Sequence, residues 1–148
     1  MFADPCLPTS ALPPILARAG GHQPVLLNEV RSFVPASAKL MVDATAGRGG
    51  HARALLDQAP QAELLALDRD PDAVTAVRET LAAYGPRAVV KQLPFSDLPH
   101  HVLAESVDFL LADLGMSSPQ LDEAERGFSF SHDGPLDMRM NPTTGSTA

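Results

Sequence analysis

The stretch that decides the fold is residues 40–51, which read LMVDATAGRGGH. Leu40 to Thr45 form an apolar run of strand length, and a glycine-rich turn and a helical apolar pattern follow directly. Glycine tolerates positive φ and lets a ligand approach the backbone closely. A strand-to-helix turn also exposes helix N-terminal amides. The stretch therefore predicts a buried strand, a tight turn and a helix. A tight turn that binds nothing explains a short glycine motif equally well.

Strand and helix patterns continue to alternate on both sides of this stretch. An amphipathic helix begins near Pro24 and ends before Pro35, and Asp70 is the expected N-cap of a helix that begins at Pro71. Ser96 is expected to cap a short helix that reaches about Ala104. Further strands are predicted at 63–67, 87–92 and 107–114. The last is a continuous apolar run, which is typical of a strand buried on both faces of a parallel sheet.

This alternation predicts an α/β fold with a doubly wound, mostly parallel sheet. Ligands of such sheets bind at the carboxyl ends of the strands, near the point where the strand order reverses. The functional residues are therefore expected in four segments, which are 43–51, 68–70, the loop at Phe95, and Asp113 onward.

Composition narrows the class of protein. The chain of 148 residues is long enough for one domain. Its net charge of −7 argues against a basic nucleic-acid-binding face on this segment. Cys6 is the single cysteine, which excludes an internal disulfide and a cysteine-rich zinc site. No metal and no membrane span are expected, since no apolar run approaches about 20 residues. A reduced, cytoplasmic compartment fits best.

The two ends of the chain differ from its centre. Residues 1–21 contain repeated Pro and are expected to be a disordered N-terminal extension. Residues 115–148 show no periodicity and are rich in Gly, Pro, Ser and Asp. A structureless stretch of this length is unusual inside a compact domain. We therefore expect residues 115–148 to be a long functional loop, or to need partners that this chain lacks.

Asp68 is the second candidate for ligand binding. It follows the predicted strand 63–67, and an acid at that place can accept hydrogen bonds from both hydroxyls of a ribose. The alternative is a solvated strand end or a helix cap, although Asp70 is better placed for capping. A glycine turn followed by this acid predicts a nucleoside ligand. It does not separate a nicotinamide cofactor from S-adenosylmethionine.

The segments after the fourth predicted strand separate these two cofactors. Residues 113–122 read DLGMSSPQLD, residues 125–130 read ERGFSF, and residues 133–140 read DGPLDMRM. With the glycine stretch, ALDRDP at 66–71 and HQPVLLNE at 22–29, the chain resembles the S-adenosylmethionine-dependent cytosine-N4 methyltransferases of small-subunit ribosomal RNA. The resemblance covers residues 22 to about 145, and the last two motifs are long and unusual.

The resemblance implies a Rossmann-like methyltransferase sheet, here truncated after about the fourth strand, so that residues 22–148 would be a partial S-adenosylmethionine-binding domain. It implies methyl transfer to the exocyclic N4 of a cytosine in 16S ribosomal RNA, with that RNA or the assembling small subunit as partner. Residue by residue, it implies catalytic roles for Asp113, Ser117 and Ser118. It implies cofactor contacts for Gly49, Gly50, His51, Asp68, Phe95, Asp113 and Gln120.

Structural alternatives stay open for several of these residues. Phe95 could be a core residue and Gln120 a loop amide. Phe128 and Phe130 could stack a flipped base or pin the loop to the core. The pairs Arg126 with Glu125 and Arg139 with Asp137 could contact RNA or form salt bridges that hold the long loop.

Two other functions are also consistent with parts of the sequence. The chain could be a truncated, non-catalytic fragment that keeps a partial cofactor site. It could also be a nicotinamide-dependent oxidoreductase, but that leaves ERGFSF and DGPLDMRM unexplained. A fourth strand at the edge of the sheet would be a pairing hazard. The sequence therefore predicts low stability or homo-association of the chain, and little activity alone.

Overall fold

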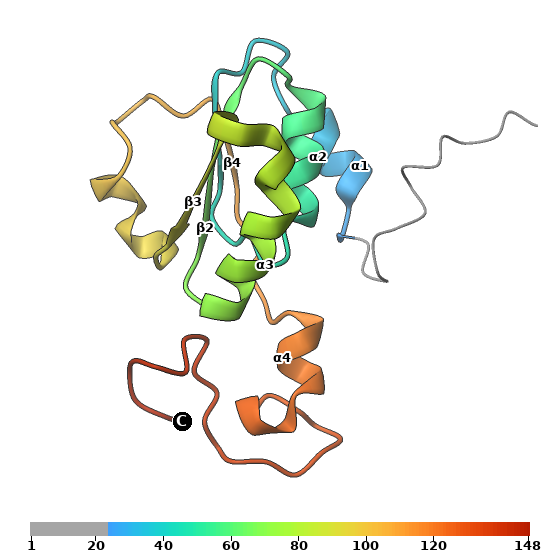
Figure 1. Ribbon diagram of the computed structural model, residues 1–148, viewed down its shortest axis with the longest axis vertical. Coiled ribbons are helices and arrows are strands. Elements are labelled where there is room, and N and C mark those ends of the chain that lie inside the picture. Colours follow the sequence, from blue (N-terminus) through green and yellow to red (C-terminus); the bar gives the residue numbers. More distant parts are fainter. Residues whose placement is uncertain (1–23) are drawn as a thin grey trace, which may run out of the picture.

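Four parallel strands form one sheet in the order β3-β2-β1-β4. The computed structural model describes residues 24–148 (Figure 1). The N-terminal extension 1–21 and the first two residues of the 22–29 motif lie outside the described residues. The parallel pairing and the order confirm the predicted α/β class. The strands are β1 (Leu40–Asp43), β2 (Glu63–Asp68), β3 (Ala88–Gln92) and β4 (Phe109–Leu111).

The helices lie on both sides of this sheet. Three of them share one face and the 3-10 helix after β3 lies on the other, so that the sheet is the middle layer (Figure 1). The first face carries α1 (Leu27–Ser32), α2 (Gly50–Gln58) and α3 (Pro71–Leu81), with the 3-10 turn η2 (Ala82–Arg87) after α3. The second face carries η3 (Phe95–His100).

Alternate residues of the strands build two apolar clusters, as the two-residue period of a strand requires. Met41 and Leu64 pack with Leu55 of α2 and Val77 of α3 on the first face. Val42, Leu65 and Leu67 form the smaller cluster on the second face, where Leu98 covers them. The first cluster is the main core because two amphipathic helices close it. The central strands are therefore fixed in register, and their carboxyl ends align.

Strand β4 corrects one expectation. The sequence predicts a strand over 107–114 that is buried on both faces, whereas β4 covers Phe109–Leu111 and the Leu110 side chain is 50% exposed. The prediction is wrong because, among residues 24–148, β4 pairs only with β1 and lies at the edge of the sheet. The predicted edge position is confirmed. The edge is short, which limits the pairing hazard, and homo-association stays a prediction.

The helix caps give one confirmed and one wrong prediction. Asp70 caps α3, where its side chain accepts a hydrogen bond from the Asp72 amide. Ser96 does not cap the next helix, because η3 already begins at Phe95 after Pro94, and the Ser96 hydroxyl contacts Asp97 instead. That helix also ends at His100, short of Ala104.

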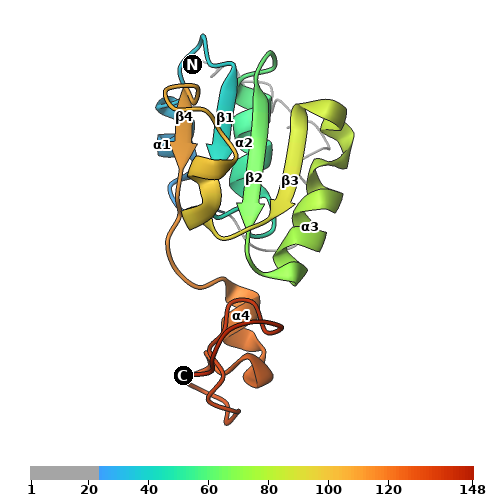
Figure 2. The same cartoon turned by 90° about the vertical axis from the view of Figure 1, so that its left-hand side faces the viewer.

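The segment after β4 lies beyond the carboxyl ends of the strands (Figure 2). It is not structureless, because it contains α4 (Ser118–Asp122) and η4 (Ala124–Arg126). Residues 127–148 carry no further helix or strand. Among residues 24–148, no helix has the length and apolar character needed to cross a membrane. The same residues hold no cluster of three or more side chains suited to a metal ion.

Candidate functional site

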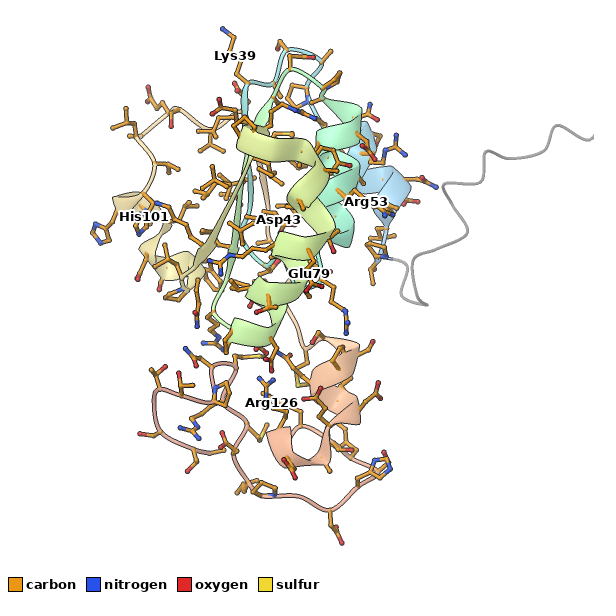
Figure 3. The ribbon with its side chains drawn as sticks, viewed as in Figure 1. Lys39, Asp43, Arg53, Glu79, His101 and Arg126 are labelled. Carbon is orange, nitrogen blue, oxygen red and sulfur yellow. The ribbon has the colours of Figure 1, made fainter. Side chains whose placement is uncertain are left out.

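Three carboxylates meet at the carboxyl ends of β1, β2 and β4. The buried carboxyl of Asp43 at the end of β1 is electrostatically coupled to those of Asp68 and Asp113. The Asp113 amide donates to the Thr45 hydroxyl at 2.7 Å, which ties the segment after β4 to the turn after β1. Figure 3 shows Asp43 within the sheet and helix layers and Arg126 in the body beyond them. The sheet thus brings together three of the four predicted segments.

Asp68 organises the turns around it. Its Oδ2 accepts the Gly47 amide at 2.8 Å, and its Oδ1 accepts the Asp70 amide at 2.9 Å. The side chain is partly exposed at the strand end. Each carboxylate oxygen can accept a further hydrogen bond. Asp68 therefore holds the glycine turn and keeps acceptor capacity on its open side.

Different physical constraints explain the three glycines of the turn. Gly49 has φ +83° and is the N-cap of α2, and a Cβ there would press on Val77 and Thr80 at 3.0 Å. A Cβ on Gly50 would collide with the Pro24 ring. Packing within the protein thus explains glycine at 49 and 50. Gly47 has φ +52° and open space above it, and it lies directly beside the Asp68 carboxylate. Room for a ligand is therefore found at Gly47.

Asp43 lies in the predicted segment 43–51, but the sequence predicts no individual role for it. It is 1% exposed, and its Oδ2 makes no hydrogen bond with the rest of residues 24–148. Burial raises the pKa of Asp43 to about 7, the carboxylates of Asp68 and Asp113 add to the rise, and the Thr45 amide opposes it. The signal in the sequence is an acid that ends an apolar strand.

His51 in the first turn of α2 lies between the glycine turn and Asp113. Its Nε2 is 3.8 Å from Asp113 Oδ2, and its Nδ1 is buried and makes no hydrogen bond within the described part of the chain. Burial lowers the pKa of His51, and this effect exceeds the opposing effect of the Asp113 carboxylate. At neutral pH the imidazole is therefore neutral and can act as a hydrogen-bonding group but not as a cation.

Phe95 follows β3 and is 53% exposed, so the core alternative for this residue is wrong. Strand β3 is the neighbour of β2 in the sheet, and both strands end at the same edge. The exposed ring therefore offers a flat apolar surface next to the strand that ends in Asp68.

Ser117 and Gln120 form a capping box at the start of α4. Gln120 is buried, its Oε1 accepts the Ser117 amide at 3.0 Å, and its Nε2 donates to Asp70 Oδ2 at 2.9 Å. The alternative, that Gln120 is a loop amide without a specific role, is therefore wrong. Ser118 begins α4 beside this box. Both polar ends of Gln120 bind protein groups in this structure.

The two predicted salt bridges of the long loop have different outcomes. Arg139 pairs with Asp137 at 2.7 Å, as the sequence indicates. Arg126 pairs with Asp70 at 2.8 Å rather than with Glu125, because Asp70 is buried at the start of α3 and Glu125 is exposed. Burial acts to raise the pKa of Asp70, but the hydrogen bonds to it outweigh that effect and the pKa lies below its usual value.

The two phenylalanines of ERGFSF differ in how exposed their side chains are. Phe128 is 5% exposed and anchors the loop, whereas Phe130 is 97% exposed and remains available for contact with another molecule.

A cleft of about 230 Å³ opens between the glycine turn, α3 and α4. Its lining residues include Gly47, Arg48, Asp70, Ser117, Gln120 and Arg126.

Comparison with known proteins gives a curated relative of this chain. Ribosomal RNA small subunit methyltransferase H from Halorhodospira halophila is 50% identical, and the match covers 86% of this chain and 41% of that protein. The chain thus spans less than half the length of this curated relative.

Two solved structures share the fold. A candidate rRNA-methylase from Clostridium thermocellum matches with a TM-score of 0.53 at 17% identity, over 61% of this chain and 49% of that one. TYW2 from P. horikoshii in complex with MeSAdo matches with a TM-score of 0.51 at 16% identity, and the match covers 70% of this chain and 37% of that chain. These structural likenesses concern the Rossmann-like methyltransferase fold alone. Residues 19–148 also match the MraW methylase family, and the chain belongs to that family.

Proposed function

We propose that this protein takes part in methylation of small-subunit ribosomal RNA, with S-adenosylmethionine as methyl donor and the N4 of a cytosine in 16S RNA as acceptor. The 50% identical relative carries the name of a small-subunit rRNA methyltransferase. The observation that carries the proposal is the meeting of the glycine turn, Asp68 and Asp113 at one end of the sheet. The partner would be that RNA or the assembling small subunit, and the compartment the cytoplasm.

The site fits the proposed cofactor. Open space lies at Gly47 next to the Asp68 carboxylate, which would accept the ribose hydroxyls. The exposed Phe95 ring would lie against the adenine. Three carboxylates nearby suit the cationic methionine end. Residues 22–148 would then be a partial cofactor-binding domain with 115–148 as its active-site loop. Gly49, Gly50, His51, Asp113 and Gln120 would complete the cofactor contacts.

The proposed mechanism follows from the chemistry of the acceptor. The bound cofactor supplies a methyl group that its sulfonium already activates. The N4 lone pair of cytosine is delocalised into the ring, so N4 needs a hydrogen-bond acceptor that offsets the positive charge developing on it. The Asp113 side chain is 51% exposed at the end of β4, and its backbone is anchored to Thr45. Asp113 would orient the amine, with Ser117 and Ser118 beside it in the same segment.

The first test is calorimetric titration of the chain with S-adenosylhomocysteine. We expect Asp68→Ala to weaken binding at least about tenfold, because a hydrogen bond to a charged group contributes roughly 1.5–3 kcal/mol. Glu63→Gln is the matched control, since Glu63 is an exposed acid at the opposite end of the same strand. Equal affinities of the wild type, Asp68→Ala and Glu63→Gln would exclude Asp68 from the cofactor site.

The second test concerns Asp113. We expect Asp113→Ala to lower the rate at which tritiated methyl groups pass from S-adenosylmethionine to small-subunit RNA by about 100-fold, as loss of one charge-stabilising group typically does. Asp122→Asn, which removes an exposed acid from the same segment, should transfer at the wild-type rate. Full transfer by Asp113→Ala with unchanged cofactor affinity would show that another group polarises the amine.

The second candidate function is a non-catalytic fragment with a cofactor site. It is favoured by one observation, which is that the match spans only 41% of the curated relative. This alternative predicts binding of S-adenosylhomocysteine without methyl transfer, so the two experiments above separate the two functions.

A further inference from the structure

Asp70 makes more contacts than a helix cap needs. Its Oδ1 accepts the Asp72 amide at 3.0 Å, which completes the cap of α3. Its Oδ2 faces the other way and accepts the Gln120 Nε2 at 2.9 Å and an Arg126 Nη at 2.8 Å. Asp70 is 3% exposed. One buried carboxylate therefore joins the sheet domain to two positions that lie 50 and 56 residues further along the chain.

Arg126 extends this connection to a third position. The same Nη2 that binds Asp70 also donates to the carbonyl oxygens of Met140 at 2.9 Å and Arg139 at 3.4 Å. The guanidinium is 11% exposed. Breaking one partner of a buried ion pair is costly because the other charge is left uncompensated. The start of α4, the end of η4 and the 139–140 backbone are thus tied to one carboxylate.

Apolar contacts contribute little to holding segment 117–140 in place. Helices α4 and η4 contain five and three residues, far fewer than an isolated helix needs in water. Phe128 is its one buried apolar side chain within the described residues. Leu136 and Phe130 are strongly exposed. Apolar burial is therefore small, and the polar contacts to Asp70 decide where the segment lies.

We propose that Asp70 is a positioning residue, which holds segment 117–140 over the carboxyl ends of the strands and thereby places Gln120 and Ser117 in the cleft that Gly47 also lines. Asp70 is suited to this role because its own amide donates to Asp68 Oδ1 at 2.9 Å. The meaning of that placement for methyl transfer rests on the proposed function. That Asp70 holds the segment in place does not depend on the proposed function.

A simple cap is the alternative role, and substitution by Asn separates the two. Asn caps helices about as well as Asp, so Asp70→Asn keeps α3 but removes the anionic acceptor for Arg126. Arg126→Gln removes the same ion pair from the other side and leaves the cap untouched. Asp72→Asn is the matched control, since the Asp72 carboxylate is 3.7 Å from Arg126 but 81% exposed.

The experiment is amide hydrogen exchange of the 148-residue chain, read by segment. We expect Asp70→Asn and Arg126→Gln each to accelerate exchange in 117–140 about tenfold or more, with β2 and α3 changed less than about twofold. The double variant should exchange more slowly than the product of the two single effects predicts, because both changes break the same Asp70–Arg126 ion pair. Asp72→Asn should exchange at the wild-type rate.

Three outcomes would overturn the proposal. They are unchanged exchange in 117–140 of Asp70→Asn, equal acceleration in β2 and α3, and multiplicative effects in the double variant. Failure of the proposed function is a separate result. If the wild type does not bind S-adenosylhomocysteine but the variants release 117–140, the cofactor assignment is wrong and the positioning role of Asp70 stands.

Discussion

Asp43→Asn is expected to stabilise the protein most above pH 7 and least below about pH 4. The pKa of Asp43 is about 7 in the folded chain against a reference value of 3.8. A raised pKa means that the folded state binds more protons than the unfolded state over that range. The free energy of unfolding of the wild type therefore falls as the pH rises from about 4 to about 7.

The size of the effect follows from the size of the shift. Three pKa units correspond to at most about 4 kcal/mol. We expect Asn to recover on the order of 2 kcal/mol at pH 8, because the buried amide must itself be desolvated. Urea unfolding between pH 4 and pH 9 measures this difference. Parallel stability curves for the wild type and Asp43→Asn would show that the pKa of Asp43 is the same in the folded and unfolded states.

Asp108→Asn is the matched control for this series. Asp108 is an exposed acid of the same sheet, and the amides of Leu40 and Lys39 that donate to it lower its pKa. Its contribution to stability is present above the unfolded pKa and is lost as the pH falls. The two variants should therefore change the pH dependence of stability in opposite directions.

Gly127→Ala is expected to destabilise segment 117–140 by about 2–4 kcal/mol. Gly127 has φ +77°, a conformation that costs other residues about 1–2 kcal/mol. A Cβ there would also collide with the Pro135 carbonyl oxygen and reach 2.8 Å from the Asp137 nitrogen. These are backbone atoms that cannot rotate away, and overpacking typically costs about 1–3 kcal/mol.

Limited proteolysis and hydrogen exchange of the segment measure the Gly127→Ala effect. Gly115→Ala is the control, because Gly115 lies in the same region with open space around it. We expect Gly115→Ala to leave protection of 117–140 unchanged. Wild-type protection in Gly127→Ala would mean that the ERGFSF and DGPLDMRM segments do not pack against each other as described.

The sequence correctly predicts the features that depend on interactions between neighbouring residues. The glycine turn, the strand that ends at Asp68 and the cap at Asp70 all follow from neighbours within a few residues. Ser96 is the local failure, because a chain that turns at Pro94 begins η3 two residues too early for Ser96 to cap it. The position of the site at the carboxyl ends of the strands then follows from the α/β alternation.

Long-range partners could not be predicted in the same way. Arg126 has an acid next to it in the sequence, yet it pairs with Asp70, 56 residues away, because burial makes that ion pair the better one. The exposure of Leu110 depends on which strands flank β4, and one strand's sequence does not contain that information. Asp43 could be located from its strand, but its raised pKa depends on how deeply the fold buries it and, to a smaller extent, on the carboxylates of Asp68 and Asp113.

The connection between β2 and α3 limits how this protein can vary in length. In Asp68–Pro71, one carboxylate holds a backbone turn, the next caps a helix and binds a distant arginine, and the proline begins the helix. One inserted residue would move these groups apart by up to about 3.3 Å, more than a hydrogen bond tolerates. Related chains should therefore gain or lose residues in the turn 103–106, where Leu103 is 81% exposed, while the four-residue spacing of Asp68–Pro71 stays constant.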